Sequence, residues 1–381
     1  MLTSTYLGRY ALWFKATNSD HLRFPTVPVN PAATPRRLER RQSPVVFDPV
    51  TVRGQDGERK VPLDALVNDT GSTALLVLRD GEVLYERYAN GGAVDRLNRC
   101  FSVTKSIGSA LVGAAIRHGH IDDIDQTVGE FLPELRGERR GELTLRQLLE
   151  MQSGIRFREG VLPWQDDART YYDPDCRRLT LGARIVDPVG EFFHYNNFCT
   201  FLIGMIVERA TGETVDRFLE RAIWQPIGAE HPASFLIDSG ANRFVHLESG
   251  FNATAADLAR FGLLYLEDGK VGGEQVLPPG WVDLSTTPEG RRTDQDYFRH
   301  YRKLPWGRPL SSGRYFYGLF WWGYLAGEAE HDYFAMGVLG EHIYVSPRHR
   351  TVIVRLSERF PPGMWWPPVF RQLAEQASMR A

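Results

Sequence analysis

The order of strand-like and helix-like segments constrains the fold of this chain more than any other feature. Two β-rich runs joined by Asp80-Gly81 predict a hairpin over residues 73–89, because Asp-Gly favours the tight turn that hairpins need. Strand patterns return only near the C-terminus, over 315–325, 342–346 and 351–357. The segment "PRHR" predicts a hairpin turn between the last two of these strands.

The middle of the chain is helical by the same criteria. Thr144 and Gln147 form a capping-box pattern, and apolar periodicity predicts helices over 102–118, 198–212, 214–224, 254–266 and 367–379. Strands near both ends with helices between them favour an α/β (α+β) protein, in which both ends of the chain build one antiparallel sheet flanked by helices. The sequence therefore predicts a sheet domain from 66–115 and 250–381 and an inserted all-α domain over 116–249. Residues 20–70 are rich in Pro, Arg and Asp and are expected to be irregular chain, and residues 1–65 are expected to be an extension packed on this body.

Composition excludes several classes of function. The net charge of -2 offers no basic surface for nucleic acid, and 43% apolar residues are usual for a globular protein. No apolar run reaches membrane-spanning length, and the N-terminal run is broken by Arg9, so neither a membrane segment nor a signal peptide is expected. Cys100, Cys176 and Cys199 fit neither a metal site nor a disulfide framework. Reduced, buried cysteines would agree with a cytoplasmic location.

The segment "RCFSVTKSIGSALVGAAIRHGH", residues 99–120, places Ser102 at the start of an apolar helix and Lys105 one turn later. Lysine is rare in this chain, with only five among 45 basic residues. Positions i and i+3 share a helix face, so the lysine can reach the serine hydroxyl, and a desolvated amine can accept its proton. The alternative is a plain helix start with a serine N-cap and a solvated lysine.

Two weaker patterns could contribute to the same site. Tyr195 and Asn197, in "FFHYNNFC", precede an apolar helix and could hold a proton-shuttling tyrosine at a cleft, although a structural turn is the simpler interpretation. Gly337 and Gly340 precede a strand and permit close approach of the backbone to a ligand, but alone they indicate only a glycine-containing loop.

Together these patterns resemble the serine β-lactamase and penicillin-binding-protein superfamily, for which Ser-x-x-Lys is the nucleophile motif. The segments "FSVTKS", "LLEMQSGI", "IWQPIGAEHPASFLID", "TAADLARFGLLYL" and "GVLGEHIYV" are most similar to the class C-like branch. That branch includes family VIII carboxylesterases and 6-aminohexanoate-dimer (nylon-oligomer) hydrolases. The similarity extends from about residue 65 to 360.

The resemblance implies a role for each matching residue. Ser102 would be the nucleophile, Lys105 its base and Tyr195 the tyrosine that protonates the leaving group. The oxyanion hole would be formed by the backbone N–H groups of Ser102 and Val338. Asn197 and Gly337 would contact substrate, and Tyr171 would do so from a mobile loop, with Tyr172 as its adjacent alternative.

The chain also departs from the family's pattern. Ala335-Met336-Gly337 stands where lactamases and peptidases carry Lys-Thr-Gly, so the cation that would meet a β-lactam carboxylate is missing. Leu339 and Glu341 replace a histidine and a glutamine that are common in the nylon-oligomer hydrolases. These departures argue against penicillin recognition and against a close copy of the nylon-oligomer substrate range.

We therefore expect a serine hydrolase that cleaves small esters or linear amides through an acyl-enzyme, with no metal or organic cofactor. Its partner would be a small-molecule substrate, and a homodimer is a possible assembly. The alternatives are a β-lactamase or D-Ala-D-Ala peptidase, and a non-catalytic binding protein of the same fold.

His118 and His120 have poor spacing for a metal site, and His194 is expected to be a packed or surface residue. Trp321 and Trp322 are expected to pack in the core.

Overall fold

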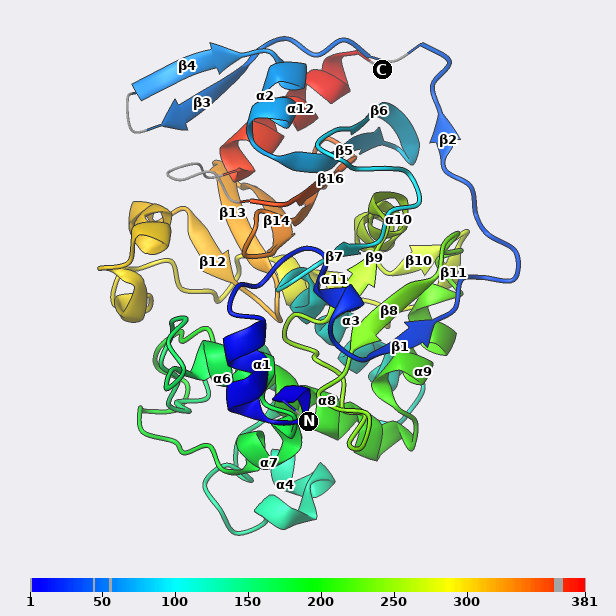
Figure 1. Ribbon diagram of the computed structural model, residues 1–381. Coiled ribbons are helices and arrows are strands. Elements are labelled where there is room, and N and C mark those ends of the chain that lie inside the picture. Colours follow the sequence, from blue (N-terminus) through cyan, green and yellow to red (C-terminus); the bar gives the residue numbers. More distant parts are fainter. Residues whose placement is uncertain (1, 44, 55–56, 360–365, 381) are drawn as a thin grey trace.

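The computed structural model describes residues 2–43, 45–54, 57–359 and 366–380, and it is built around one eight-stranded sheet (Figure 1). In spatial order the strands are β12 (Tyr315–Tyr317), β13 (Trp322–Gly327), β14 (Glu330–Met336), β15 (His342–Ser346), β16 (Thr351–Ser357), β5 (Ser72–Arg79), β6 (Glu82–Tyr88) and β2 (Glu39–Arg40). Neighbouring strands are antiparallel except the β2–β6 pair. The pairing of β16 with β5 joins the two ends of the chain, which confirms the predicted sheet.

The hairpin of β5 and β6 turns where Asp80-Gly81 predicted. Both residues have positive φ, 49° and 86°, as a two-residue turn that follows the twist of the strands requires. Strands β5 and β16 are buried along nearly their whole length. Helix α10 (Ala255–Leu266) covers one face of these strands, and α2 (Leu63–Asp69) and α12 (Pro367–Met379) cover the other (Figure 1).

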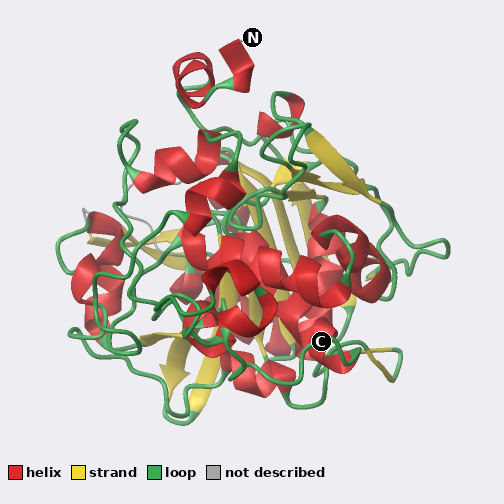
Figure 2. Ribbon diagram, turned by 90° about the horizontal axis from the view of Figure 1, so that it is seen from below, coloured by secondary structure: helices red, strands yellow, loops and turns green. Residues whose placement is uncertain are grey.

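The remaining helices gather on the α10 side, where they lie in front of the strands in Figure 2. They are α3 (Val103–Arg117), α4 (Val128–Phe131), α5 (Leu145–Leu149), α6 (Asp166–Tyr172), α7 (Cys176–Leu181), α8 (Asn197–Thr211), α9 (Val215–Leu219), η4 (Glu220–Trp224) and α11 (Trp281–Thr286). The capping box at Thr144 and Gln147 and the left-handed Gly212 that ends α8 are where the sequence predicts them. Helix α3 packs against α8, η4 and β14, so its first turn lies where the helices meet the sheet.

The N-terminal segment is more regular than predicted. It forms α1 (Tyr6–Leu12), the hairpin strands β3 (Val50–Gly54) and β4 (Gly57–Val61), and the strand β1 (Thr26–Val29). Strand β1 completes a second sheet of order β1-β8-β9-β7, with β8 (Ala233–Leu236), β9 (Phe251–Ala253) and β7 (Asn98–Arg99). The prediction of irregular chain over 20–70 was wrong: β3 and β4 pair locally as a hairpin, and β1 pairs with β8, more than 200 residues later in the sequence. The domain boundaries stay a prediction.

The C-terminal strands also differ from prediction. Residues 315–325 form two strands, β12 and β13, because Phe320 adopts a positive φ of 59° in a turn between them. Strand β14 was missed. The short remaining elements are η1 (Leu2–Ser4), η2 (Asp20–Leu22), η3 (Pro133–Leu135), η5 (Arg299–Tyr301), η6 (Pro305–Ser312), β10 (Lys270–Val271) and β11 (Glu274–Gln275). The three cysteines are buried and unpaired, as expected.

Replacing Gly323 by alanine tests the packing of β13 on β12. Gly323 pairs with Phe316, and a Cβ atom there would overlap the Phe316 ring. Overpacking of this kind should lower the free energy of unfolding by about 1–3 kcal/mol. Gly327→Ala, on the same strand, is the matched control, because its Cβ would meet only Glu330 Cβ at 4.0 Å. The measurement is the midpoint of urea unfolding, and equal midpoints for the two variants would contradict the packing argument.

Candidate active site

Ser102 lies at an unusual backbone turn between β7 and α3. The residue before it, Phe101, has a positive φ of 46°, a conformation that a bulky side chain adopts only when its surroundings hold it there. The Cys100 N–H donates to the Phe251 carbonyl oxygen at 2.8 Å, which ties this turn to the second sheet. The Ser102 hydroxyl does not cap α3. The N-cap alternative therefore does not describe this serine.

Lys105 is buried and its amine is directed at Ser102. Its Nζ lies 3.2 Å from Ser102 Oγ and 2.8 Å from the Glu248 carbonyl oxygen, and it lies 4.7 Å from the centre of the Tyr195 ring. Burial lowers the pKa of the Lys105 amine to about 8, and the negative charges of Glu248 and Asp167 oppose part of that fall. A substantial fraction of this amine is neutral near pH 8 and can accept the serine proton.

Tyr195 meets Lys105 at the serine. Burial raises the pKa of Tyr195, and a hydrogen bond with Ser102 opposes part of the rise, so the phenol keeps its proton at neutral pH. The Tyr195 N–H donates to Tyr301 Oη at 2.6 Å, and its ring stacks on Trp322 at 5.9 Å. The Lys105 amine also lies over the face of the Tyr195 ring.

The glycine-containing loop lies beside the serine turn. A Cβ atom on Gly337 would come within 2.7 Å of the Cys100 carbonyl oxygen and would overlap the Glu341 carboxyl group, so only glycine fits. Val338, which follows Gly337, lines the same cavity as Ser102. In the part of the chain that the structure describes, neither the Ser102 nor the Val338 N–H donates to a protein acceptor. Two unengaged backbone donors beside a nucleophile are what an oxyanion hole needs.

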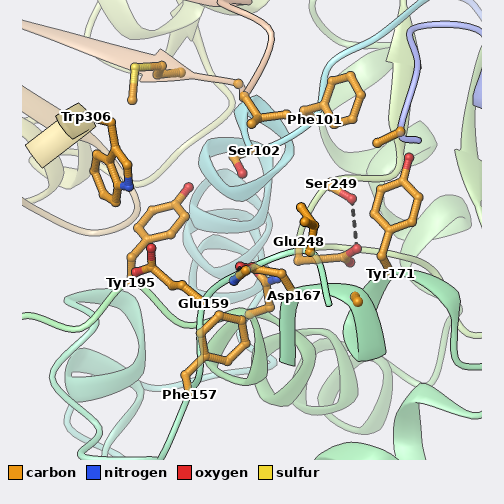
Figure 3. Close-up of a pocket in the computed structure, with 18 of the residues that line it drawn as sticks. Phe101, Ser102, Phe157, Glu159, Asp167, Tyr171, Tyr195, Glu248, Ser249 and Trp306 are labelled. Carbon is orange, nitrogen blue, oxygen red and sulfur yellow. Dashed lines mark hydrogen bonds between the residues drawn. The ribbon is translucent and has the colours of Figure 1, made fainter. Parts of the chain in front are cut away.

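One cavity of about 600 Å³ is lined by Ser102, Tyr195, Gly337 and Val338, among others (Figure 3). In this view Tyr195 and Trp306 lie on one side of Ser102, and Glu248, Ser249 and Tyr171 on the other. The full lining is Phe14, Ala16, Phe101, Ser102, Phe157, Glu159, Gly160, Val161, Asp167, Ala168, Tyr171, Tyr172, Tyr195, Asn197, Glu248, Ser249, Leu304, Trp306, Trp322, Met336, Gly337 and Val338. Aromatic and aliphatic side chains dominate this wall, so the cavity suits a small, mostly apolar molecule.

The charge of the cavity was not predicted. Glu159, Asp167 and Glu248 face it, and none of the described lining residues is arginine or lysine. Burial raises the pKa of Glu159 to about 7, helped by the nearby charge of Asp167, and burial raises the pKa of Asp167 to about 6. No motif marks these acidic residues in the sequence, because the fold alone brings them to Ser102.

Tyr171 lines the cavity, but not from a mobile loop. It belongs to helix α6, and its hydroxyl bonds Asp20 and accepts from Arg99 Nη1 at 2.6 Å. Arg99 is itself buried and also donates to Ser249 Oγ at 2.9 Å. Tyr172, its neighbour, also reaches the cavity wall and donates to the Trp13 carbonyl oxygen at 2.6 Å. The expected loop position was wrong because the helix and this polar network fix the tyrosine.

Of the other residues considered in the sequence, some line the cavity and others pack outside it. Asn197 begins α8, lines the cavity and donates to Thr170 Oγ1 at 3.0 Å. Trp322 forms part of the cavity wall, whereas Trp321 packs in the core against Tyr265. His194 stacks on His300, and burial lowers the pKa of His194 to about 4. Both tryptophans are buried in the hydrophobic core, as expected, and Trp322 also lines the cavity.

The departures from the family's pattern lie at the end of β14 and in the glycine-containing loop that follows it. Met336 ends β14, and its neighbour Ala335 is buried, so no cation takes the place of the lysine in Lys-Thr-Gly. Glu341 is fully buried, accepts a hydrogen bond from the Leu339 N–H at 3.1 Å, and its pKa is raised by burial to about 8. Glu341 thus supports the loop from behind and does not line the cavity.

Comparison with known proteins agrees with this geometry. The beta-lactamase family model matches residues 63–377. A 6-aminohexanoate-dimer hydrolase of Paenarthrobacter ureafaciens is 30% identical over 334 residues, which cover 84% of this chain and 81% of that protein. Esterase EstB of Burkholderia gladioli is 29% identical over 177 residues, 40% of this chain and 44% of that enzyme.

A solved structure supports the same assignment of fold. A Bacillus anthracis protein named as a 6-aminohexanoate-dimer hydrolase superposes with a TM-score of 0.76 at 23% identity, covering 96% of this chain and 92% of that one. Among the described residues, no helix is long and apolar enough to cross a membrane. The resemblance inferred from the motifs is thereby confirmed: the chain belongs to the beta-lactamase family and is a serine hydrolase of that superfamily.

Proposed function

We propose that this enzyme hydrolyses small esters and linear amides through an acyl-enzyme on Ser102. The observation that carries the proposal is the contact of the buried Lys105 amine with the Ser102 hydroxyl at the wall of an apolar cavity. A weakly basic, desolvated amine and a serine at hydrogen-bond distance form a nucleophile and its base. The named relatives, an amide hydrolase and an esterase, support this range of substrates.

Acylation follows from the positions of the groups. Neutral Lys105 takes the Ser102 proton while Oγ attacks the substrate carbonyl carbon, and the carbonyl oxygen becomes an oxyanion held by the Ser102 and Val338 N–H groups. The tetrahedral intermediate then expels the alcohol or amine, which receives a proton from the Tyr195 hydroxyl. The Lys105 ammonium returns the missing proton to Tyr195, so the base is neutral again.

Deacylation repeats these steps with water as the nucleophile. Water attacks the acyl carbon and gives up a proton to the same basic groups, and the oxyanion returns to the two N–H groups. Collapse of this intermediate breaks the bond between the acyl carbon and Ser102 Oγ, the serine regains its proton, and a carboxylic acid leaves.

The cavity indicates which substrates suit this enzyme. Its acidic groups repel a carboxylate, and it offers no arginine or lysine among the described lining residues to bind one. Uncharged acyl and leaving groups fit the wall formed by Phe157, Trp306 and Trp322.

A homodimer and a cytoplasmic location stay predictions, which sedimentation and cell fractionation can test.

Substitution of Ser102 by alanine tests the nucleophile. Hydrolysis of a short-chain p-nitrophenyl ester should fall at least about 10³-fold, because the acyl-enzyme cannot form. Ser109→Ala is the matched control: Ser109 is buried on the same helix, does not line the cavity, and should keep kcat within about twofold. Circular dichroism shows whether the variants are folded, and equal rates for wild type and a folded Ser102→Ala protein would refute the assignment. An active-serine probe that fails to label the native protein would favour a non-catalytic binding protein instead.

The pH dependence of kcat/KM tests Lys105 as the base. Below a pKa of about 8 the amine is mostly protonated and cannot accept the serine proton, so the rate should fall about tenfold per pH unit as pH decreases below 8. The measurement is ester hydrolysis from pH 6 to 10, corrected for the uncatalysed reaction. Lys105→Arg stays charged throughout this range and should lose at least about 10³-fold at every pH. A flat profile in the wild type would exclude Lys105 as the base.

A chromogenic cephalosporin separates this proposal from the lactamase alternative. With no cation at Ala335-Met336-Gly337 and acidic groups in the cavity, kcat/KM for the cephalosporin should be at least about 10³-fold below that for the ester. Both substrates are compared on one preparation, and Ser102→Ala serves as the blank. Turnover of the cephalosporin as fast as the ester would favour a β-lactamase, and turnover of a D-Ala-D-Ala peptide would favour a peptidase.

A further inference from the structure

Three side chains from distant segments meet beside the active site without a role in it. They are Asp187, which follows α7, His194, which precedes α8, and His300 in η5. One potential ligand atom from each lies within 4.8 Å of the other two. They line a second cavity of about 320 Å³, together with Arg156, Phe157, Glu159, Val186 and Leu304.

One ring nitrogen of His194 and one of His300 lack a hydrogen-bond partner. Their rings stack at 4.2 Å with 12° between planes, and His194 Nδ1 and His300 Nε2 are buried without a hydrogen-bond partner. Asp187 Oδ2 lies 3.8 Å from His300 Nε2, which is too long for a hydrogen bond. The other oxygen, Oδ1, accepts from Arg299 Nη2 at 3.4 Å. Buried nitrogens without partners are rare in folded proteins and call for an explanation.

We propose that Asp187, His194 and His300 bind a Zn²⁺ ion. Two imidazole nitrogens and one carboxylate oxygen are ligands that Zn²⁺ prefers, and water would complete a four-coordinate site. Bonds of about 2.0–2.2 Å require the three ligand atoms to come closer together than in the present structure, with rotation of the stacked rings. Asp187 and Glu159 supply negative charge around the ion, against the positive charges of Arg156 and Arg299.

The position of this site links it to the proposed chemistry. His194 precedes Tyr195 and His300 precedes Tyr301, and the Tyr195 N–H donates to Tyr301 Oη at 2.6 Å. Phe157, Glu159 and Leu304 form part of both cavities. Drawing the ligand atoms of His194 and His300, up to 4.8 Å apart, onto one ion would therefore pull on the two segments that position Tyr195 and Tyr301. Since a displacement of about 1 Å can cost a large factor in rate, bound Zn²⁺ should lower kcat. This consequence rests on the proposed function, whereas binding does not.

Isothermal titration calorimetry with ZnCl₂ tests binding independently of activity. We expect one ion per chain in the wild type and in Ser102→Ala, and at least about tenfold weaker binding in His300→Gln and in Asp187→Asn. His120→Gln is the matched control, because His118 and His120 form another histidine pair, with ring centres 6.4 Å apart, and should bind as the wild type does. Two separate ligand substitutions keep the test valid if one variant does not fold.

The outcomes separate the site from its effect. No Zn²⁺ binding in the wild type, or undiminished binding in folded His300→Gln and Asp187→Asn, would overturn the site, as would loss of binding in His120→Gln alone. At the lowest Zn²⁺ concentration that saturates the wild type, kcat for the ester should fall at least about threefold in the wild type. At the same concentration, kcat of Asp187→Asn should fall less than about 1.5-fold. Binding without loss of activity would overturn the coupling. Loss of activity in Ser102→Ala concerns the proposed function alone, because that variant retains the zinc ligands.

Discussion

The burial of the Lys105 amine is the constraint on which the rest of the site depends. Taking an ammonium group out of water is costly, and the protein offers Lys105 a backbone carbonyl, a serine hydroxyl and an aromatic face, with no carboxylate in an ion pair among the described residues. The cost appears as a pKa near 8, which makes the amine useful as a base. A carboxylate in direct contact would stabilise the ammonium and raise its pKa, so that too little neutral amine would be present at neutral pH to accept a proton.

Several segments that are distant in the sequence together shield the Lys105 amine from water. Helix α3 supplies the lysine, the segment before α8 supplies Tyr195, and the chain before β9 supplies the Glu248 carbonyl group. Strand β14 then leads into a loop that fits against the serine turn only because Gly337 has no side chain. The eight-stranded sheet holds these elements in register, so the geometry of the serine, its base and the two N–H groups depends on the whole fold.

Under the proposed function, the acidic character of the cavity accounts for a range of substrates different from that of the lactamases. The acylating groups require only a serine, a base and two backbone donors, whereas recognition depends on the walls. Here the walls carry Glu159 and Asp167, with carboxyl pKa values raised by burial, in place of a cation at Ala335-Met336-Gly337. Substrate class can therefore change through residues that leave Ser102 and Lys105 untouched.

The sequence by itself determined several of the elements and the proposed nucleophile and base. Asp80-Gly81 predicted the hairpin, apolar periodicity predicted α3, α8 and α10, and the i, i+3 spacing placed Lys105 against Ser102, because each of these is a local property of the chain. The local pattern marked Tyr195 as a candidate, and motif resemblance gave it a role and added Val338; both residues line the cavity. Only the tertiary structure showed that β1 joins β8, that α6 holds Tyr171, and that Glu159 and Asp167 face the serine. It alone brought Asp187, His194 and His300 together. These features depend on contacts between residues far apart in sequence, which no local pattern records.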